Sequence, residues 1–288
     1  MRRLKYAINN LVDVDTLIDV YSEDDVYVMD NLYNGRPSKP YRSTDIGAIG
    51  FPEWICVTFP APRMISLVAL FNHNLTRLEG VGDELRFKGC NLGCESPECD
   101  WDAGAGLHEV DISGSLIEVE KGGRPTFENL YFRTKMREPN YRLDIIDQNN
   151  PDGHIEIGEY FLGNWEDFSM NCFLQPGRPD SPMYFKGDQQ TFMGQDWMSY
   201  YSKAKEMTLT FVNISTPDQV NEIETFLDRV HENGGRVVII PDRDSRFCFL
   251  MKIEDTSGFG LRTLYGEDGE RKTWTIPMKA LTTGVMLL

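Results

Sequence analysis

The fold is decided by the stretch Asp30-Asn-Leu-Tyr-Asn-Gly-Arg-Pro-Ser-Lys-Pro-Tyr-Arg-Ser-Thr44, which is followed by apolar runs at Trp54–Phe59 and Ile65–Phe71 and then by Asn72-His-Asn-Leu75. The first part contains Asn-Gly and two prolines, a composition typical of a loop. The two apolar runs are short and continuous, as expected for strands covered on both faces. The order therefore predicts a surface loop that leads into two buried β-strands.

Strand patterns also dominate the C-terminal part of the chain. Trp274, Ile276 and Met278 alternate with polar residues, as on a half-buried strand. Asp268-Gly269 lies between this segment and an apolar run that starts at Leu261, which predicts a β-hairpin.

One helix stands out among the strands, over residues 217–233. Thr216 is suited to cap it, Pro217 suits its first turn, and Gln219 lies at the capping-box position. Apolar residues recur on one helical face at Val220, Ile223, Phe226, Leu227 and Val230.

Composition limits the function classes. The chain has 288 residues, of which 41% are hydrophobic, so one large or two medium domains with a real core are expected. It carries 29 Lys and Arg against 45 Asp and Glu, a formal charge of −16. Because such a surface repels phosphate, we expect no direct nucleic-acid binding. No run reaches the roughly 20 apolar residues that a membrane helix needs, so no membrane partner is expected.

The opening stretch resembles a galactose-binding-like (discoidin-type) β-sandwich, in which a similar turn precedes a Trp-led strand. It is most similar to such sandwiches in structural proteins of tailed-phage virions, where an Asn-Leu-x-x-Gly-x-Pro-Ser-x-x-x-Arg-Ser-Thr run precedes a His-Asn-Leu. The segments Asn140–Asp147 and Ile155–Gly163 resemble the last two strands of that sandwich, and Gly234–Asp242 resembles part of the second domain. The family's calcium-loop aspartate is Asn34 here, which speaks against bound calcium.

The resemblance implies a structural component of a tailed-phage virion, in the tail, baseplate or neck, that is made in the host cytoplasm and catalyses nothing. Its partners would be other virion proteins and further copies of itself. The expected fold class is mainly β. The expected parts are a jelly-roll, galactose-binding-like sandwich over residues 1–165, an extended connecting arm over 166–203, and a β-rich α+β domain with the one main helix over 204–288.

The cysteines are the most distinctive chemical feature. Cys90, Cys94 and Cys99 lie close together in one segment. Three interpretations are open: a structural zinc with His108 or Cys56 as the fourth ligand, a disulfide, or a turned loop with unpaired thiols. The spacing fits no strong zinc pattern. No other cofactor is expected.

No catalytic motif is present: the sequence has no His-Glu-x-x-His, no Gly-x-Ser-x-Gly and no Gly-x-x-x-x-Gly-Lys. The leading alternative function is a carbohydrate-binding module that contacts host or matrix glycans. Its loops would need an aromatic platform, which Tyr33, Tyr41 and Trp101 are candidates to supply. An oxygen-rich cluster at Asp144, Asp147, Asn149 and Asp152 favours a hydrogen-bonded turn over a calcium site.

The segment 166–203 is rich in aromatic residues but shows no sustained period. It is either a long loop packed on its own domains or an arm that packs on a neighbouring subunit. The second interpretation predicts a homo-oligomer whose interface includes Phe185, Phe192, Trp197, Tyr200 and Tyr201.

Overall fold

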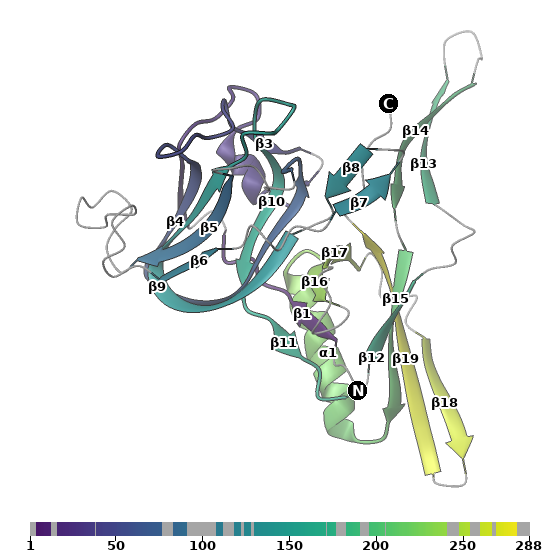
Figure 1. Cartoon of the computed structure of the whole chain (residues 1–288). Helices are drawn as coiled ribbons and strands as arrows, with labels where there is room; N and C mark the ends of the chain where they lie inside the picture. Colours follow the sequence, from purple (N-terminus) through teal and green to yellow (C-terminus); the bar gives the residue numbers. More distant parts are fainter. Residues whose placement is uncertain are drawn as a thin grey trace. The chain divides into compact units, whose positions relative to one another are not determined.

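The computed structural model contains two compact units, each with its own sheet and core (Figure 1). One unit comprises Asn9–Trp165 with Arg246–Cys248, and the other comprises Met1–Ile8, Glu166–Ser245 and Phe249–Leu288. The residues that the structure describes are 4–12, 16–37, 39–76, 83–90, 108–111, 118–121, 124–127, 130–170, 172–176, 183–190, 196–204, 206–240, 248–253, 260–266 and 269–280.

The first unit is built on a seven-stranded sheet in the order β3-β10-β4-β9-β5-β6, with β2 also paired to β4. Two further short strands pair only with each other among the described strands. The elements of this unit are β2 (Leu17–Val20), the 3-10 helix η1 (Met29–Leu32), β3 (Tyr41–Arg42), β4 (Glu53–His73), β5 (Glu84–Cys90), β6 (His108–Asp111), β7 (Glu118–Lys121), β8 (Arg124–Phe127), β9 (Leu130–Ile146) and β10 (Glu156–Gly163).

The long strand β4 converts this sheet into a two-layered sandwich. Its first half pairs with β2 and its second half pairs with β10, while β9 runs beside it along both halves. The β4–β9 register shifts between Thr58 and Arg63, where Pro60 and Pro62 are exposed. Because proline cannot donate to the ladder, pairing breaks there and the strand bends from one layer into the other.

The core of the sandwich lies between the two halves of these bent strands. Alternate residues of β4, β9, β5 and β10 point into it, as the period of a strand requires. Tyr141 and Phe87 stack with ring centroids 5.4 Å apart. Its buried members include Leu32, Ile55, Val57, Ile65, Val68, Leu70, Leu85, Phe87, Tyr141, Leu143, Ile157, Tyr160 and Leu162.

The second unit has an eight-stranded sheet in the order β11-β1-β16-β17-β19-β15-β12, with β18 paired to β19. One helix, α1 (Pro217–Glu232), accompanies this sheet. The described strands of this unit, including β13 and β14 outside that sheet, are β1 (Lys5–Ala7), β11 (Glu166–Asp167), β12 (Cys172–Pro176), β13 (Met183–Gln190), β14 (Asp196–Ala204), β15 (Glu206–Ile214), β16 (Arg236–Ile240), β17 (Phe249–Lys252), β18 (Gly260–Gly266) and β19 (Gly269–Ala280).

The helix forms as its sequence predicts. Thr216 and Gln219 make the reciprocal capping box, and Pro217 occupies the first turn. Ile223, Phe226 and Val230 are buried in the core of this unit. Ile276 and Met278 of β19 are buried in the same core, and β18 and β19 form the predicted hairpin. The expected mainly β fold with one main helix is therefore confirmed.

The structure corrects two of the expected boundaries. Residues 4–8 do not belong to the sandwich, because Lys5, Tyr6 and Ala7 pair with β16 of the second unit. The segment 166–203 is not a single extended arm. Its strands β11 and β12 join the sheet of the second unit, while β13 and β14 form an antiparallel hairpin. Backbone hydrogen bonding to a sheet, which periodicity alone does not reveal, places these strands.

Within the described residues, no helix combines the length and the apolar character needed to cross a membrane.

Candidate functional site

Four loops of the sandwich meet where β3, β4 and β10 end or begin. We call this the loop end and define it as residues 21–27, 42–47, 73–76 and 147–156. Glu156 pairs with Arg42, and Ile157 pairs with His73. The amide of Asp24 donates to the carbonyl of Arg42 at 2.9 Å, so the loop 21–27 is tied to β3. Main-chain pairing therefore holds all four loops at one place.

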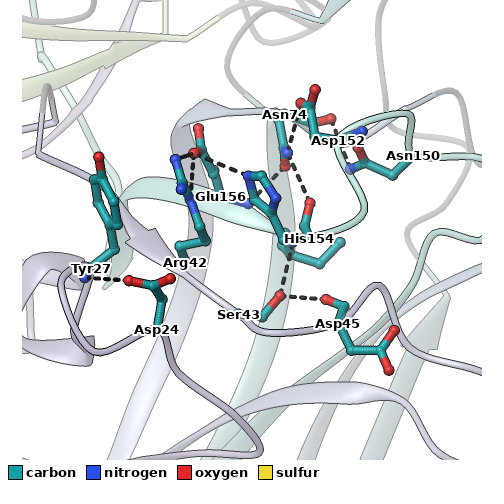
Figure 2. A network of polar contacts seen from close by, with 11 residues as sticks. Asp24, Tyr27, Arg42, Ser43, Asp45, Asn74, Asn150, Asp152, His154 and Glu156 are labelled. Carbon is teal, nitrogen blue, oxygen red and sulfur yellow. Dashed lines mark hydrogen bonds and ion pairs between the residues drawn. The ribbon is translucent and has the colours of Figure 1, made fainter.

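A trio of polar side chains, Arg42, Glu156 and His154, occupies the centre of the loop end (Figure 2). The Nε of Arg42 donates to Oε1 of Glu156 at 2.8 Å, and its Nη2 donates to the same oxygen. Nε2 of His154 lies 3.2 Å from that oxygen. The guanidinium also lies 4.0 Å from the ring centroid of Tyr27. Desolvation lowers the pKa of Arg42, but the hydrogen bond and charge of Glu156 outweigh it and leave the pKa above its ordinary value.

Asn74 links this trio to the neighbouring loop. Its Nδ2 donates to the carbonyl of His154 at 2.9 Å and to Oδ2 of Asp152 at 3.1 Å. Its Oδ1 accepts from the amide of Glu156 at 2.7 Å (Figure 2). Because the side chain of Asn74 bonds to main-chain groups of His154 and Glu156, the trio is held by main-chain as well as side-chain bonds.

The buried carboxylate of Asp147 stabilises the loop of residues 147–156. Asp147 is fully buried, and its Oδ2 accepts from the amide of Thr76 at 2.8 Å and from Nδ2 of Asn150 at 3.2 Å. Burial raises the pKa of Asp147, and the hydrogen bonds from Thr76 oppose that shift. Its partners are amide and hydroxyl donors, so it acts as a turn-forming residue.

The other oxygen ligands of the predicted cluster point to different partners. Asp144 binds Lys88 at 2.7 Å, and Nδ2 of Asn149 donates to Oδ2 of Asp83 at 3.0 Å. Asp152 accepts from Asn74. Across the described residues, no group of three or more His, Cys, Asp and Glu side chains gathers in a way that would hold a metal ion.

The trio keeps hydrogen-bonding capacity for a ligand. The side chains of Arg42, Glu156 and His154 are 29%, 25% and 23% exposed. Among the described residues, no hydrogen bond uses Nη1 of Arg42, Oε2 of Glu156 or Nδ1 of His154. The site can therefore offer a cationic donor, an anionic acceptor and an imidazole nitrogen that donates or accepts according to its tautomer.

Of the three residues predicted for an aromatic platform, the structure describes Tyr41 and Tyr33. Tyr41 is only 2% exposed and its hydroxyl donates to the carbonyl of Ser22 at 2.6 Å, so it is a core residue and not a loop platform. Tyr33 is half-buried against the sandwich core, and its hydroxyl donates to Oδ1 of Asp30 at 2.8 Å. Trp101 lies outside the described residues.

The predicted zinc ligand Cys90 is disulfide-bonded, as is Cys56. A disulfide sulfur is not a thiolate, so neither residue is available as the metal ligand that the sequence allowed. Cys94 and Cys99 lie outside the described residues, and His108 is described only as the first backbone position of β6.

The predicted interface residues lie on or beside the β13–β14 hairpin. Phe185 is on β13, and Trp197, Tyr200 and Tyr201 are on β14. Trp197 is paired with Gln189, and Tyr200 is paired with Lys186. Phe192 lies outside the described residues.

Sequence reasoning missed the trio and Asn74. Arg42 lies in the loop-like stretch 30–44, and His154 directly precedes the apolar Ile155. The sequence did contain one signal for this site, because polar residues lie at or beside the ends of the segments that form the paired strands β3, β4 and β10. Only the register shows that Arg42 and Glu156 face each other.

Comparison with known proteins finds similar solved structures. No protein-family profile matches the chain. No curated protein matches it either. One similar structure is the family 32 carbohydrate-binding module of C. perfringens NanJ in complex with galactose, with 13% identity, coverage of 56% of this chain and 99% of that chain, and a TM-score of 0.35. Another is chitosan-binding module 2, in complex with chitotriose, of a chitosanase/glucanase from Paenibacillus sp. IK-5, with 12% identity, coverage of 52% and 97%, and a TM-score of 0.35.

Proposed function

We propose that the sandwich unit is a carbohydrate-binding module and that the loop end is its binding site. The observation that carries this proposal is the trio of Arg42, Glu156 and His154, which is held in place on one side and open to solvent on the other. Loops on a rigid β-scaffold are where binding residues are commonly found.

The chemistry of the trio suits a polyhydroxylated ligand. Neighbouring sugar hydroxyls donate and accept in alternation, so they need both kinds of partner at fixed spacing. Arg42 supplies only donors and ionised Glu156 only acceptors, and hydrogen bonds to charged groups are about twice as strong as neutral ones. The ion pair already fixes the side chains of Arg42 and Glu156 on each other, and Asn74 and the β3–β10 pairing fix the main chain that carries them, so binding would lose little side-chain entropy.

A glycan array with the full chain tests the proposal. We expect selective binding to a subset of neutral glycans, and its loss in R42A. Arg86 provides a matched control, because it forms a similarly exposed ion pair with Glu84 at 2.8 Å outside the loop end. R86A should bind like the wild type. Equal binding by R42A and the wild type would contradict the proposed position of the site. An array with no selective binding would contradict carbohydrate binding as the function.

A second candidate function is supported by a different observation. β13 and β14 pair with each other and, among the described strands, with no other. A two-stranded hairpin is marginally stable by itself in water. A neighbouring copy of the chain would supply the missing contacts, which agrees with the resemblance to tailed-phage virion proteins and their assembly into particles.

Deletion of the hairpin tests this second function. Residues 183–203 can be replaced by a short Gly/Ser linker that leaves β12 and β15, which pair with each other, in place. If the hairpin mediates assembly, light scattering should show a concentration-dependent oligomer for the full chain and only monomer for the deletion variant. A monomeric full chain at high concentration and high salt would argue against self-assembly, since salt screens the repulsion between copies that each carry a charge of −16.

A further inference from the structure

Ser22 connects the loop 21–27 to three other parts of the sandwich. Its Oγ donates to Oε2 of Glu53 at 2.9 Å and accepts from the amide of Thr44 at 3.0 Å. Its carbonyl oxygen accepts from the hydroxyl of Tyr41 at 2.6 Å. Glu53 begins β4, Tyr41 lies on β3, and Thr44 belongs to the loop 42–47. The loop 21–27, which is part of the loop end, is therefore tied to the start of β4 through a carboxylate.

The carboxylate of Glu53 lies in surroundings that disfavour its ionised form. The residue is 2% exposed, and its Oε1 has no hydrogen-bond partner among the described residues. Burial raises the pKa of Glu53 to about 7, the hydrogen bond from Ser22 opposes this rise, and the negative charge of Asp45 adds to it. Tyr41 stays a neutral hydroxyl, since burial and the charges of Glu53 and Glu23 raise its pKa. None of the charges that act on Glu53 within the described residues is positive.

An ionised Glu53 gains water with least disruption if the loop 21–27 opens. On β9 the register partner of Glu53 is Ile145, which belongs to the buried core. In the loop, by contrast, the side chains of Glu23, Asp25 and Val26 are exposed. Because a segment with few buried contacts opens at a low cost in free energy, the loop is the part that moves.

We propose that Glu53 and Ser22 form a pH-sensitive switch on the loop end: the loop 21–27 is closed while the Glu53 carboxyl is protonated and opens when it ionises. The loop holds Arg42 of the proposed binding site. The amide of Arg42 donates to the carbonyl of Tyr27 at 2.9 Å, and the guanidinium carbon lies 4.0 Å from the centroid of the Tyr27 ring. Opening removes both contacts, so the affinity for a ligand falls. This last step rests on the proposed function, whereas the opening of the loop does not.

The direction of the switch follows from the two protonation states. A carboxyl whose pKa is about 7 in the closed form and near its ordinary 4.5 in the open form binds its proton more tightly when the loop is closed. The closed form is therefore favoured at low pH, and its advantage is lost as pH rises from about 4.5 to about 7. Between about pH 5.5 and about pH 8 the ratio of open to closed forms rises by up to about 25-fold.

Hydrogen exchange of the ligand-free full chain, followed by mass spectrometry, tests the switch. The reporters are the amides of Asp24 and Thr44, which donate to the carbonyl of Arg42 and to Oγ of Ser22. After correction for the intrinsic exchange rate at each pH, we expect their protection to fall about tenfold between about pH 5.5 and about pH 8 in the wild type. In E53Q the side chain stays neutral and still accepts from Ser22, so the protection should not change with pH.

An amide of the second unit provides the internal reference for this measurement. The amide of Gly235 donates to the carbonyl of Val230 at 2.8 Å, and its protection should be the same in both proteins at each pH. A wild-type fall of less than about threefold at the reporter amides, or an equal fall in E53Q, would overturn the switch.

The variant D45N assigns the titration to Glu53. Because the charge of Asp45 raises the pKa of Glu53, its removal should lower that pKa, and the fall in protection should end at a lower pH than in the wild type. D25N is the matched control, because it removes an exposed charge of the same loop and should leave that end point unchanged. An unchanged end point in D45N would overturn the role of Glu53.

Calorimetry with the best glycan from the array measures the effect on binding. The wild type should bind at least about threefold more weakly at about pH 8 than at about pH 5.5. E53Q should lose less affinity, and any contribution of His154 is common to both proteins. Equal losses in the two proteins would overturn the regulation of the site. An array without selective binding would contradict the proposed function, while the exchange measurement would still decide whether the switch exists.

Discussion

Arg42 and Glu156 face each other as a register pair between β3 and β10, and the guanidinium donates through Nε to Oε1 at 2.8 Å. The pair lies at the loop end, where His154 contacts the same carboxylate oxygen. One antiparallel pairing thus brings together residues that are 114 positions apart in the chain.

Removing the guanidinium should affect ligand binding more than stability. For R42A we expect at least a tenfold loss of glycan affinity, about 1.4 kcal/mol, measured by calorimetry with the best ligand from the array. The free energy of unfolding should change by no more than about 1 kcal/mol, because the ion pair is partly exposed. A stability loss that alone accounts for the lost binding would show a structural role for Arg42.

The pH dependence of stability should depend on Glu53. This side chain is buried, Ser22 donates to its Oε2 at 2.9 Å, and its Oε1 has no hydrogen-bond partner among the described residues. Burial raises the pKa of Glu53 to about 7 from 4.5. The folded state then holds a proton that the unfolded chain has lost, so this group's contribution to stability is lost as pH rises from about 4.5 to about 7, by up to about 1.4 kcal/mol per pH unit.

The variant E53Q should remove that contribution. Urea unfolding at a series of pH values should show the difference between E53Q and the wild type growing in favour of E53Q as pH rises across this window. E84Q, at a partly exposed ion pair with Arg86, should keep the wild-type slope. Parallel wild-type and E53Q profiles would mean that Glu53 is ionised in the folded state at low pH.

The helix cap should make a measurable contribution to the second unit. In T216A the side-chain oxygen that accepts from the amide of Gln219 is lost, which should cost about 1 kcal/mol of unfolding free energy. S215A is the control, because the bond from Ser215 to Gln219 uses its backbone amide. Equal urea midpoints for T216A and S215A would contradict a stabilising role for the capping box.

Gly158 should tolerate no side chain. A Cβ there would lie 2.3 Å from the carbonyl oxygen of Pro37 and 2.9 Å from Cβ of Asn72. We expect G158A to lose about 3 kcal/mol of stability, because backbone must move to admit the methyl group. G153A meets nothing within 4 Å and should lose only about 1 kcal/mol, from its φ of +71°. Similar unfolding temperatures for the two variants would show that the backbone around Pro37 moves at little cost in stability.

Much of the fold could be predicted because it depends on local patterns. Alternation in β19, the capping signals around Thr216 and the Asp268-Gly269 turn act over a few residues, so the strand, the helix and the hairpin follow from the order of side chains. The boundaries of the units were harder to predict. β1 and β11 are short, and they are placed by pairing with partners more than 150 residues away.

What the sequence by itself determined was a mainly β chain with one capped helix, an acidic surface and no familiar catalytic motif. Tertiary structure alone decided the site. Tyr41 has the composition of a loop aromatic but lies in the core, because its strand β3 pairs with β10. Arg42, one residue later, points the other way and meets Glu156. Since neighbouring residues of a strand face opposite sides, a single register decides which one is buried and which one is free to bind.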